Sequence, residues 1–253
     1  IEFERNAIRR GAEVHWAETA EEANAIVLGI AQRNGVKTIT KSKSMVTEEI
    51  ALNDVLIDAG IRVMETDLGE YILQLAGEPP SHIVAPAVHK SKEQVAELFM
   101  HAHHKPLLTE IPAMTREARE QLRSHFLGAD MGISGANFVI AETGTTLTVT
   151  NEGNADLVTT LPRIHCVVTG IEKVIPTMED FATLIRLLPR SAIGQSIANY
   201  LTLTTGVKAP GETDGPEQMH IVLVDAGRTK LVGSDMKDML RCIRCGACMN
   251  HCP

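Results

Sequence analysis

Four cysteines near the end of the sequence have the residue type and spacing of a metal site. They form the pattern C-x2-C-x2-C-x3-C-P, and their positions are Cys242, Cys245, Cys248 and Cys252. This is the bacterial ferredoxin spacing for an iron–sulfur cluster, because soft thiolates suit iron and short gaps let one tight loop wrap around the cluster. Gly246 provides the backbone freedom that such a loop needs. We therefore expect these four cysteines to be ligands of a [4Fe–4S] cluster.

A zinc site is the other interpretation of the cysteine run, but zinc usually takes two separated C-x2-C pairs. In two-cluster ferredoxins the fourth cysteine of such a run ligates the other cluster, so the first three need a ligand from a second run. The sequence contains no second run, and Cys166 lies in an apolar segment typical of a buried strand. We expect the chain to continue beyond residue 253, with two clusters in the full-length protein that are incomplete or absent in this portion.

The composition excludes several classes of protein. The 253 residues include 24 basic and 32 acidic side chains. The formal net charge of −8 is opposite in sign to that of a protein that binds the phosphate backbone of nucleic acids. Aromatic residues make up 3% of the chain, too few for stacking single-stranded nucleic acid. No apolar run approaches the ~20 residues of a membrane span, and the charged start does not resemble a secretory signal. We expect a soluble, cytoplasmic protein with no nucleic-acid partner and no membrane span.

The elements that position the cysteines alternate between helical and extended patterns. Capping residues and apolar periodicity predict helices over residues 19–34, 47–59, 67–77, 91–103 and 115–127. Short β-branched or apolar segments predict strands over residues 36–40, 61–65 and 82–85. Short connections between such elements mean parallel strands joined by right-handed crossovers. The predicted fold class is therefore α/β, an open and mostly parallel sheet with helices on both faces.

After residue 128 the pattern changes to a mixed β region. Residues 137–141 and 145–150 predict two antiparallel strands joined by a tight turn, and we interpret Gly128, Gly132 and Gly135 as turn glycines. The later elements are predicted strands at 164–170 and 219–225 and a helix at 178–188. We place one α/β domain over residues 1–238 and the start of a truncated ferredoxin-type segment over residues 239–253.

Polar residues that follow the predicted strands are candidate ligand-binding residues, because open α/β sheets bind ligands at the carboxyl ends of their strands. Lysines and hydroxyls that suit an anion follow strand 36–40, although a solvated loop would have the same composition; they are Lys41, Ser42, Lys43 and Ser44. A second polar loop follows strand 145–150 and consists of Asn151, Glu152, Gly153 and Asn154. Arg163 and Arg190 could each clamp a carboxylate or form a structural ion pair.

The predicted hairpin turn contains a candidate nucleophile, Glu142, followed by Thr143, Gly144 and Thr145. This sequence resembles the Glu-before-Gly turn of CoA transferases, in which the carboxylate attacks the substrate. An ordinary hairpin turn is the alternative. We name Glu142 as the candidate catalytic residue and the three residues after it as candidate ligand contacts.

Several further segments are distinctive in combination. They read ADMGISGAN at 129–137, AETGT at 141–145, TNEGN at 150–154, LPR at 161–163 and LLPRS at 187–191. Together with the cysteine run they resemble the bacterial L-lactate utilisation (LUD domain) family, in particular its LutB-like iron–sulfur subunits. The resemblance implies a fold similar to the sugar-phosphate isomerase and CoA-transferase superfamily. It also implies a cytosolic complex with LutA-like and LutC-like partners that oxidises L-lactate to pyruvate.

Three hypotheses for function follow. The first is an iron–sulfur electron-transfer subunit of a lactate-oxidising complex, which is not catalytic alone, because a cluster carries single electrons and no G-x-G-x-x-G dinucleotide motif follows a strand. The second is a CoA-transferase-like enzyme that binds an acyl group, a phosphate or another anion and uses Glu142 as the nucleophile. The third is a non-catalytic scaffold in which the cluster is structural.

Overall fold

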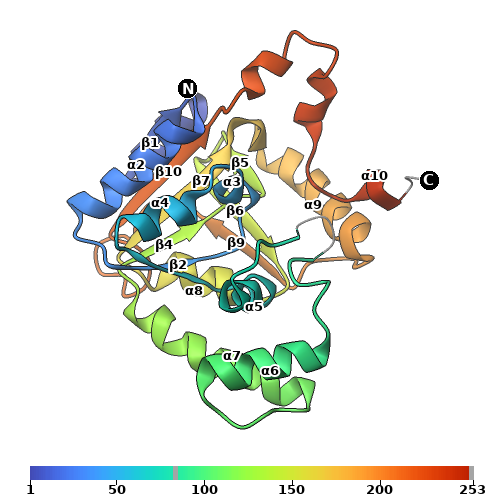
Figure 1. The fold of residues 1–253 in the computed structure, drawn as a ribbon. Helices are drawn as coiled ribbons and strands as arrows, with labels where there is room; N and C mark the ends of the chain where they lie inside the picture. The colour runs from blue at the N-terminus through green and yellow to red at the C-terminus, as the bar shows by residue number, and fades with distance from the viewer. Residues whose placement is uncertain (82–84, 251–253) are drawn as a thin grey trace.

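The centre of the molecule is a six-stranded parallel sheet with the strand order β1-β10-β7-β4-β2-β3 (Figure 1). The structure is a computed structural model that describes residues 1–81 and 85–250. The sheet strands are β1 (Ala12–Ala17), β2 (Thr38–Lys41), β3 (Arg62–Glu65), β4 (Met131–Ser134), β7 (Ile164–Gly170) and β10 (Gln218–Val224). Every neighbouring pair is parallel, which confirms the α/β prediction. Parallel strands bring all their carboxyl ends to one edge of the sheet.

Helices on one face of this sheet bury the larger apolar core. They are α2 (Ala20–Arg33), α3 (Met45–Glu49) and α4 (Leu52–Asp58). Val27 of α2 and Leu56 of α4 are fully buried and belong to one cluster with strand residues such as Cys166. Thr19 caps α2 by accepting the N–H of Glu22, as the sequence predicts.

The opposite face is covered by a helix and a second, four-stranded mixed sheet. Helix α1 (Glu2–Arg9) buries Phe3 and Ala7 against β10. The second sheet has the order β8-β5-β6-β9, formed by β5 (Phe138–Ile140), β6 (Thr145–Thr150), β8 (Val174–Ile175) and β9 (Tyr200–Thr204). Strands β5 and β6 are antiparallel, so the predicted hairpin is confirmed. Helix α9 (Met178–Ile193) packs Phe181 and Leu188 on this sheet.

The remaining long helices lie beside β3, at one edge of the parallel sheet. Helices α5 (Leu68–Ala76), α6 (Lys92–His103) and α7 (Ile111–Gly128) form a separate apolar cluster beside β3, drawn at the bottom of Figure 1. The short elements are α8 (Asn154–Thr160), η1 (Ile171–Lys173), η2 (Arg228–Leu231), η3 (Lys237–Arg241) and α10 (Ala247–Asn250). In the part of the chain that the structure describes, no helix has the length and hydropathy to cross a membrane.

The structure corrects two local predictions. The helix predicted over residues 47–59 is divided into α3 and α4, because Ala51 has a left-handed backbone (φ +51°) that ends one helix before the next begins. Gly132 is a residue of β4 and not a turn glycine, since a Cβ built on it would lie 1.9 Å from the carbonyl oxygen of Val158 in α8. The strand predicted over residues 82–85 falls mostly on residues 82–84, which lie outside the described residues.

The close approach at Gly132 predicts a stability effect. We expect Gly132→Ala to lower the free energy of unfolding by about 2 kcal/mol or more, because an extra methyl forces apart a backbone contact that cannot move easily. Gly128→Ala is the control, since a Cβ at Gly128 would contact nothing within 4 Å. Urea unfolding of both variants measures the effect, and an equal change in the two would contradict this packing.

Candidate functional site

A cavity of about 490 Å³ lies at the carboxyl edge of the parallel sheet. One side of it comes from the loops that follow the strands. Ser42, Lys43 and Ser44 come from the end of β2, Asp67 follows β3, and Lys173 follows β7. Gly135, Ala136 and Asn137 complete this side after β4. The cavity is therefore where the strand topology predicts a ligand site.

The other side of the cavity combines the second sheet with the cysteine segment. Strand β6 and the loop after it contribute residues 148–152, which include Asn151 and Glu152, and α9 contributes Leu188. Ile243, Arg244 and Gly246, which lie between the first cysteines of the run, are also lining residues. The loop expected to hold a cluster is thus a wall of the cavity.

Specific contacts fix the cysteine loop in this place. The buried ammonium of Lys173 donates a hydrogen bond to the carbonyl oxygen of Cys242 at 3.0 Å. The guanidinium of Arg244 donates to the sulfur of Met45 in α3 at 3.1 Å. Ile243 and Cys245 pack against the apolar cluster of α9 and the second sheet. These contacts join the loop to three different parts of the domain.

The local conformation and chemistry of the loop fit an iron–sulfur cluster. Arg244 and Gly246 both have positive φ, +59° and +74°, so the chain turns sharply between cysteines. Cys242, Cys245 and Cys248 are free thiols, and Cys252 lies outside the described residues. The N–H of Ala247 and the side chain of Ser191 hold the pKa of the Cys245 thiol below its usual value, which favours the thiolate.

The spacing of the described thiols does not suit a single zinc ion. Cys242, Cys245 and Cys248 do not all lie within 4.8 Å of one another, considering the described residues alone. A tetrahedral zinc ion with bonds of ~2.3 Å would hold its thiolates about 3.8 Å apart. Free thiols are the donors that an iron–sulfur cluster takes, so the chemistry of the donor set fits the expected group.

The charges around the cavity favour a small anion. Lys43, Lys173 and Arg244 line it, together with the carboxylates of Asp67 and Glu152. Burial lowers the pKa of Lys173, which sits in the wall between the cavity and Cys242. Guanidinium and ammonium donors are the groups that proteins use to bind carboxylates and phosphates.

The family of the chain follows from comparison with known proteins. The sequence profile of the LUD domain matches residues 2–224. The chain belongs to the LUD domain family. "Lactate utilization protein B" of Lysinibacillus sphaericus (strain C3-41) is 51% identical over 249 residues, which are 98% of this chain and 52% of that protein. The "Uncharacterized electron transport protein YkgF" of Escherichia coli (strain K12) is 50% identical over 249 residues, 97% of this chain and 52% of that protein.

This LUD chain spans about half the length of the curated relatives it matches. The family predicted from the sequence motifs is confirmed by these matches. A crystal structure of a DUF162 family protein from Deinococcus radiodurans is 13% identical, with a TM-score of 0.49, over 88% of this chain and 94% of that one.

Beneath the cavity of the LUD domain, Lys41 forms a buried charge pair. Its side chain has no exposure to solvent, and its Nζ lies 2.9 Å from Oε1 of Glu65 and 3.2 Å from Oγ1 of Thr47. Burial lowers the pKa of Lys41, but the negative charge of Glu65 beside it outweighs this effect and raises the pKa overall. Burial and the neighbouring Glu65 raise the pKa of Glu70 to about 10, so Glu70 is protonated at neutral pH. Lys41 thus supports the cavity from below and does not line it.

Other predicted site residues lie away from the cavity lining. The Glu142 carboxylate accepts the N–H of Met178 at 3.0 Å and so caps the start of α9. The rest of that turn, Thr143, Gly144 and Thr145, packs beside α1, where a Cβ on Gly144 would lie 2.4 Å from the nitrogen of Ala7.

Two predicted arginines are also placed outside the lining. Arg163 precedes β7 at the amino end of the sheet, and its guanidinium donates to the carbonyl oxygen of Asn34. Arg190 lies on α9 beside the lining residue Pro189. The sequence analysis did not single out Lys173, Arg244, Asp67 or Asn137. A signal was present for Arg244, which lies inside the first C-x2-C, and for Asn137, which ends the distinctive segment 129–137.

The buried charges predict contrasting effects of two substitutions. We expect Lys41→Met to lower the free energy of unfolding by about 3–5 kcal/mol at pH 7, because it leaves the Glu65 carboxylate buried without its partner. Glu70→Gln is its matched variant. We expect this change to be nearly neutral near pH 5, because Glu70 is already uncharged there.

The pH dependence of Glu70→Gln separates charge from packing. In the folded protein Glu70 keeps its proton up to about pH 10, whereas the unfolded chain releases it near 4.5. Raising the pH between these values therefore favours unfolding of the wild type, and the glutamine variant lacks this loss. Urea unfolding from pH 5 to 9 should show the variant gaining stability relative to the wild type. A difference that stays constant with pH would contradict the assignment.

Proposed function

We propose that this chain is the LUD domain, with the start of the cluster segment, of an iron–sulfur electron-transfer subunit in a cytoplasmic lactate-utilising complex. The observation that carries the proposal is that the cysteine loop forms one wall of the cavity at the carboxyl edge of the sheet. The printed names of the relatives, a lactate utilisation protein and an electron transport protein, support the same assignment. The chemistry of the cavity supplies the substrate class, a small carboxylate.

In this proposal the cysteines and the cavity have separate tasks. A [4Fe–4S] cluster, when bound, supplies one-electron transfer and cannot accept a hydride. Cys242, Cys245 and Cys248 would hold it, with a further ligand from a second cysteine run, and Cys252 would ligate the second cluster. Oxidation of lactate to pyruvate releases two electrons and two protons, so LutA-like and LutC-like partner subunits supply the two-electron step and the acceptor.

In this proposal the residues of this chain bind and orient the small anion in the cavity. Arg244 and Lys173 line the cavity and would bind the carboxylate of a small acid or another anion, and the amides of Asn137 and Asn151 would offer neutral donors. Lys173 also contacts the backbone at Cys242, so it links the cavity to the expected cluster. An anion in the cavity would therefore change the electrostatic environment of the cluster segment.

The first test is the metal content of anaerobically prepared full-length protein. We expect about eight irons and eight acid-labile sulfides per chain, with an EPR signal after dithionite, because two [4Fe–4S] clusters are expected. About four irons would show a single cluster and would contradict the expectation of two. Folded protein without iron would contradict the proposal.

The buried cation next to the first cysteine predicts a shift in redox potential. We expect Lys173→Met to lower the midpoint potential of the cluster by on the order of 50 mV, about 1 kcal/mol for one electron, because a nearby positive charge stabilises the reduced form. Arg241→Met is the matched control, since it removes the same charge beside Cys242 from a side chain that is 83% exposed. An equal shift in both variants would contradict the specific role of Lys173.

A further inference from the structure

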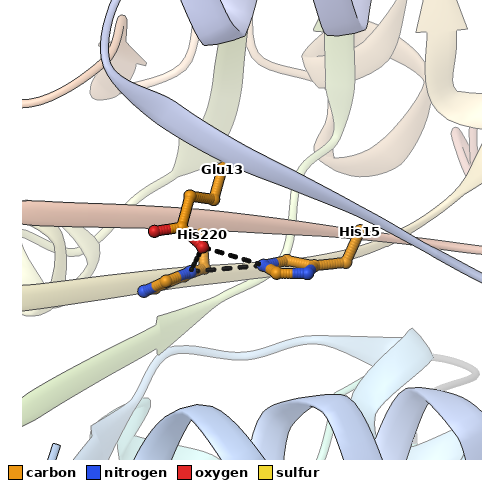
Figure 2. A group of neighbouring side chains, drawn as sticks. All are labelled: Glu13, His15 and His220. Atoms are coloured by element: carbon orange, nitrogen blue, oxygen red, sulfur yellow. Dashed lines mark hydrogen bonds and ion pairs between the residues drawn. The ribbon is translucent and has the colours of Figure 1, made fainter.

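Two histidines and a glutamate converge on the other end of the parallel sheet from the cavity. Glu13 and His15 lie on β1, and His220 lies on β10, directly opposite Glu13 in the strand register. Because strand side chains alternate, all three project from the same face of the sheet, the face that α2 covers. Figure 2 shows their side-chain tips directed toward one another.

The spacing of the three ligand atoms matches a small tetrahedral ion. The His15 Nε2 atom lies 3.2 Å from the His220 Nδ1 atom. The Glu13 Oε2 atom lies 3.5 Å from His220 Nδ1 and 4.0 Å from His15 Nε2. A tetrahedral ion with bonds of 2.0–2.1 Å holds neighbouring ligand atoms about 3.3 Å apart. Among the described residues, this is the group of histidine, cysteine and carboxylate side chains whose ligand atoms all lie within 4.8 Å.

The protonation state and orientation of the imidazoles also suit metal binding. The His220 Nε2 atom lies 3.4 Å from Oε1 of Gln218, so its N–H can point to that oxygen and leave Nδ1 free to ligate. Burial lowers the pKa of both His15 and His220, against the opposing effect of the Glu13 carboxylate. Both rings are therefore neutral at pH 7, which is the form that binds metals.

The exposure of the three side chains leaves room for a further ligand. The His220 side chain is 3% exposed, His15 is 22% exposed and Glu13 is 66% exposed. A bound ion would thus be held by a buried histidine on one side and would reach solvent on the other. Two histidines, one carboxylate and an open position form a donor set that zinc accepts.

We propose that Glu13, His15 and His220 form a zinc-class divalent metal site, separate from the cysteine run, with water as the fourth ligand. The ion would join the edge strand β1 to β10 at the amino ends of the strands. Since β1 has only β10 as a neighbour in the sheet, such a link would hold the sheet edge in register. Neither the lactate chemistry nor the cluster requires this site.

The test uses anaerobic full-length protein with its cysteines loaded with iron, dialysed against a chelator and then titrated with Zn²⁺. We expect one zinc per chain, and an X-ray absorption spectrum with nitrogen and oxygen at about 2.0–2.1 Å and no sulfur at about 2.3 Å. Zinc should also raise the melting temperature. If the clusters are not incorporated, the same titration on full-length protein with the cysteines of both runs changed to serine answers the question.

Variants locate the ion. We expect His15→Gln and Glu13→Gln each to weaken zinc binding at least about 100-fold, because even the loss of an outer-shell partner costs 10- to 100-fold. Glu13 is largely exposed, so its variant should fold even if a histidine variant does not. His125→Gln, a half-buried histidine on α7, is the control and should leave binding unchanged. Sulfur ligation, no binding, or unchanged affinity in Glu13→Gln and His15→Gln would overturn the proposal.

Discussion

The ammonium of Lys41 is fully removed from water, and the arrangement around the cavity depends on how that charge is compensated. Glu65 at the end of β3 provides the opposite charge, and Glu70 at the start of α5 stays protonated beside it. The Lys41 backbone carbonyl accepts both the N–H and the hydroxyl of Thr66. This one residue therefore ties β2 to β3 and to the helices that follow them. The loop from Ser42 to Ser44 leaves that anchored point directly into the cavity.

The parallel topology explains why a cavity and a cysteine loop can share a wall. The loops that follow β2, β3, β4 and β7 meet at the cavity on the carboxyl edge of the sheet, and the chain returns to this cavity after β10, the last strand. Ile243, Arg244 and Gly246 then line the cavity. Lys173 fixes this loop at Cys242, and Met45 fixes it at Arg244. A ligand in the cavity and a metal group on the cysteines would consequently both lie in the electrostatic field of Lys173 and Arg244.

Much of the fold could be predicted from local sequence. The capping residue Thr19, the β-branched segment before Lys41 and the hairpin around Gly144 carry their information within a few residues, and each is in the structure as expected. The break at Ala51 could not be predicted, because no glycine or proline marks it. The prediction that Gly132 is a turn glycine was wrong for a related reason. This position needs glycine because the backbone of α8, a separate element of the chain, packs directly against it.

The candidate sites also differ in how much of each could be predicted from local sequence. The cysteine run is visible because four cysteines lie within eleven residues. Lys173 gave no signal, since its importance comes from contact with Cys242, 69 residues away. His15 and His220 are 205 residues apart and meet only because β1 and β10 pair. Residue type and spacing predict chemistry when the ligands are local, and strand pairing determines it when they are not.

The central claim is that the cysteine loop and the cavity form one site. The most direct measurement is an iron anomalous difference map from anaerobic crystals of the full-length protein. The account predicts iron density bonded to Cys242, Cys245 and Cys248, at the wall of the cavity, with Lys173 still contacting the backbone of Cys242. Iron density at the far end of the molecule, or a cysteine loop turned away from Lys173 and the cavity, would contradict it.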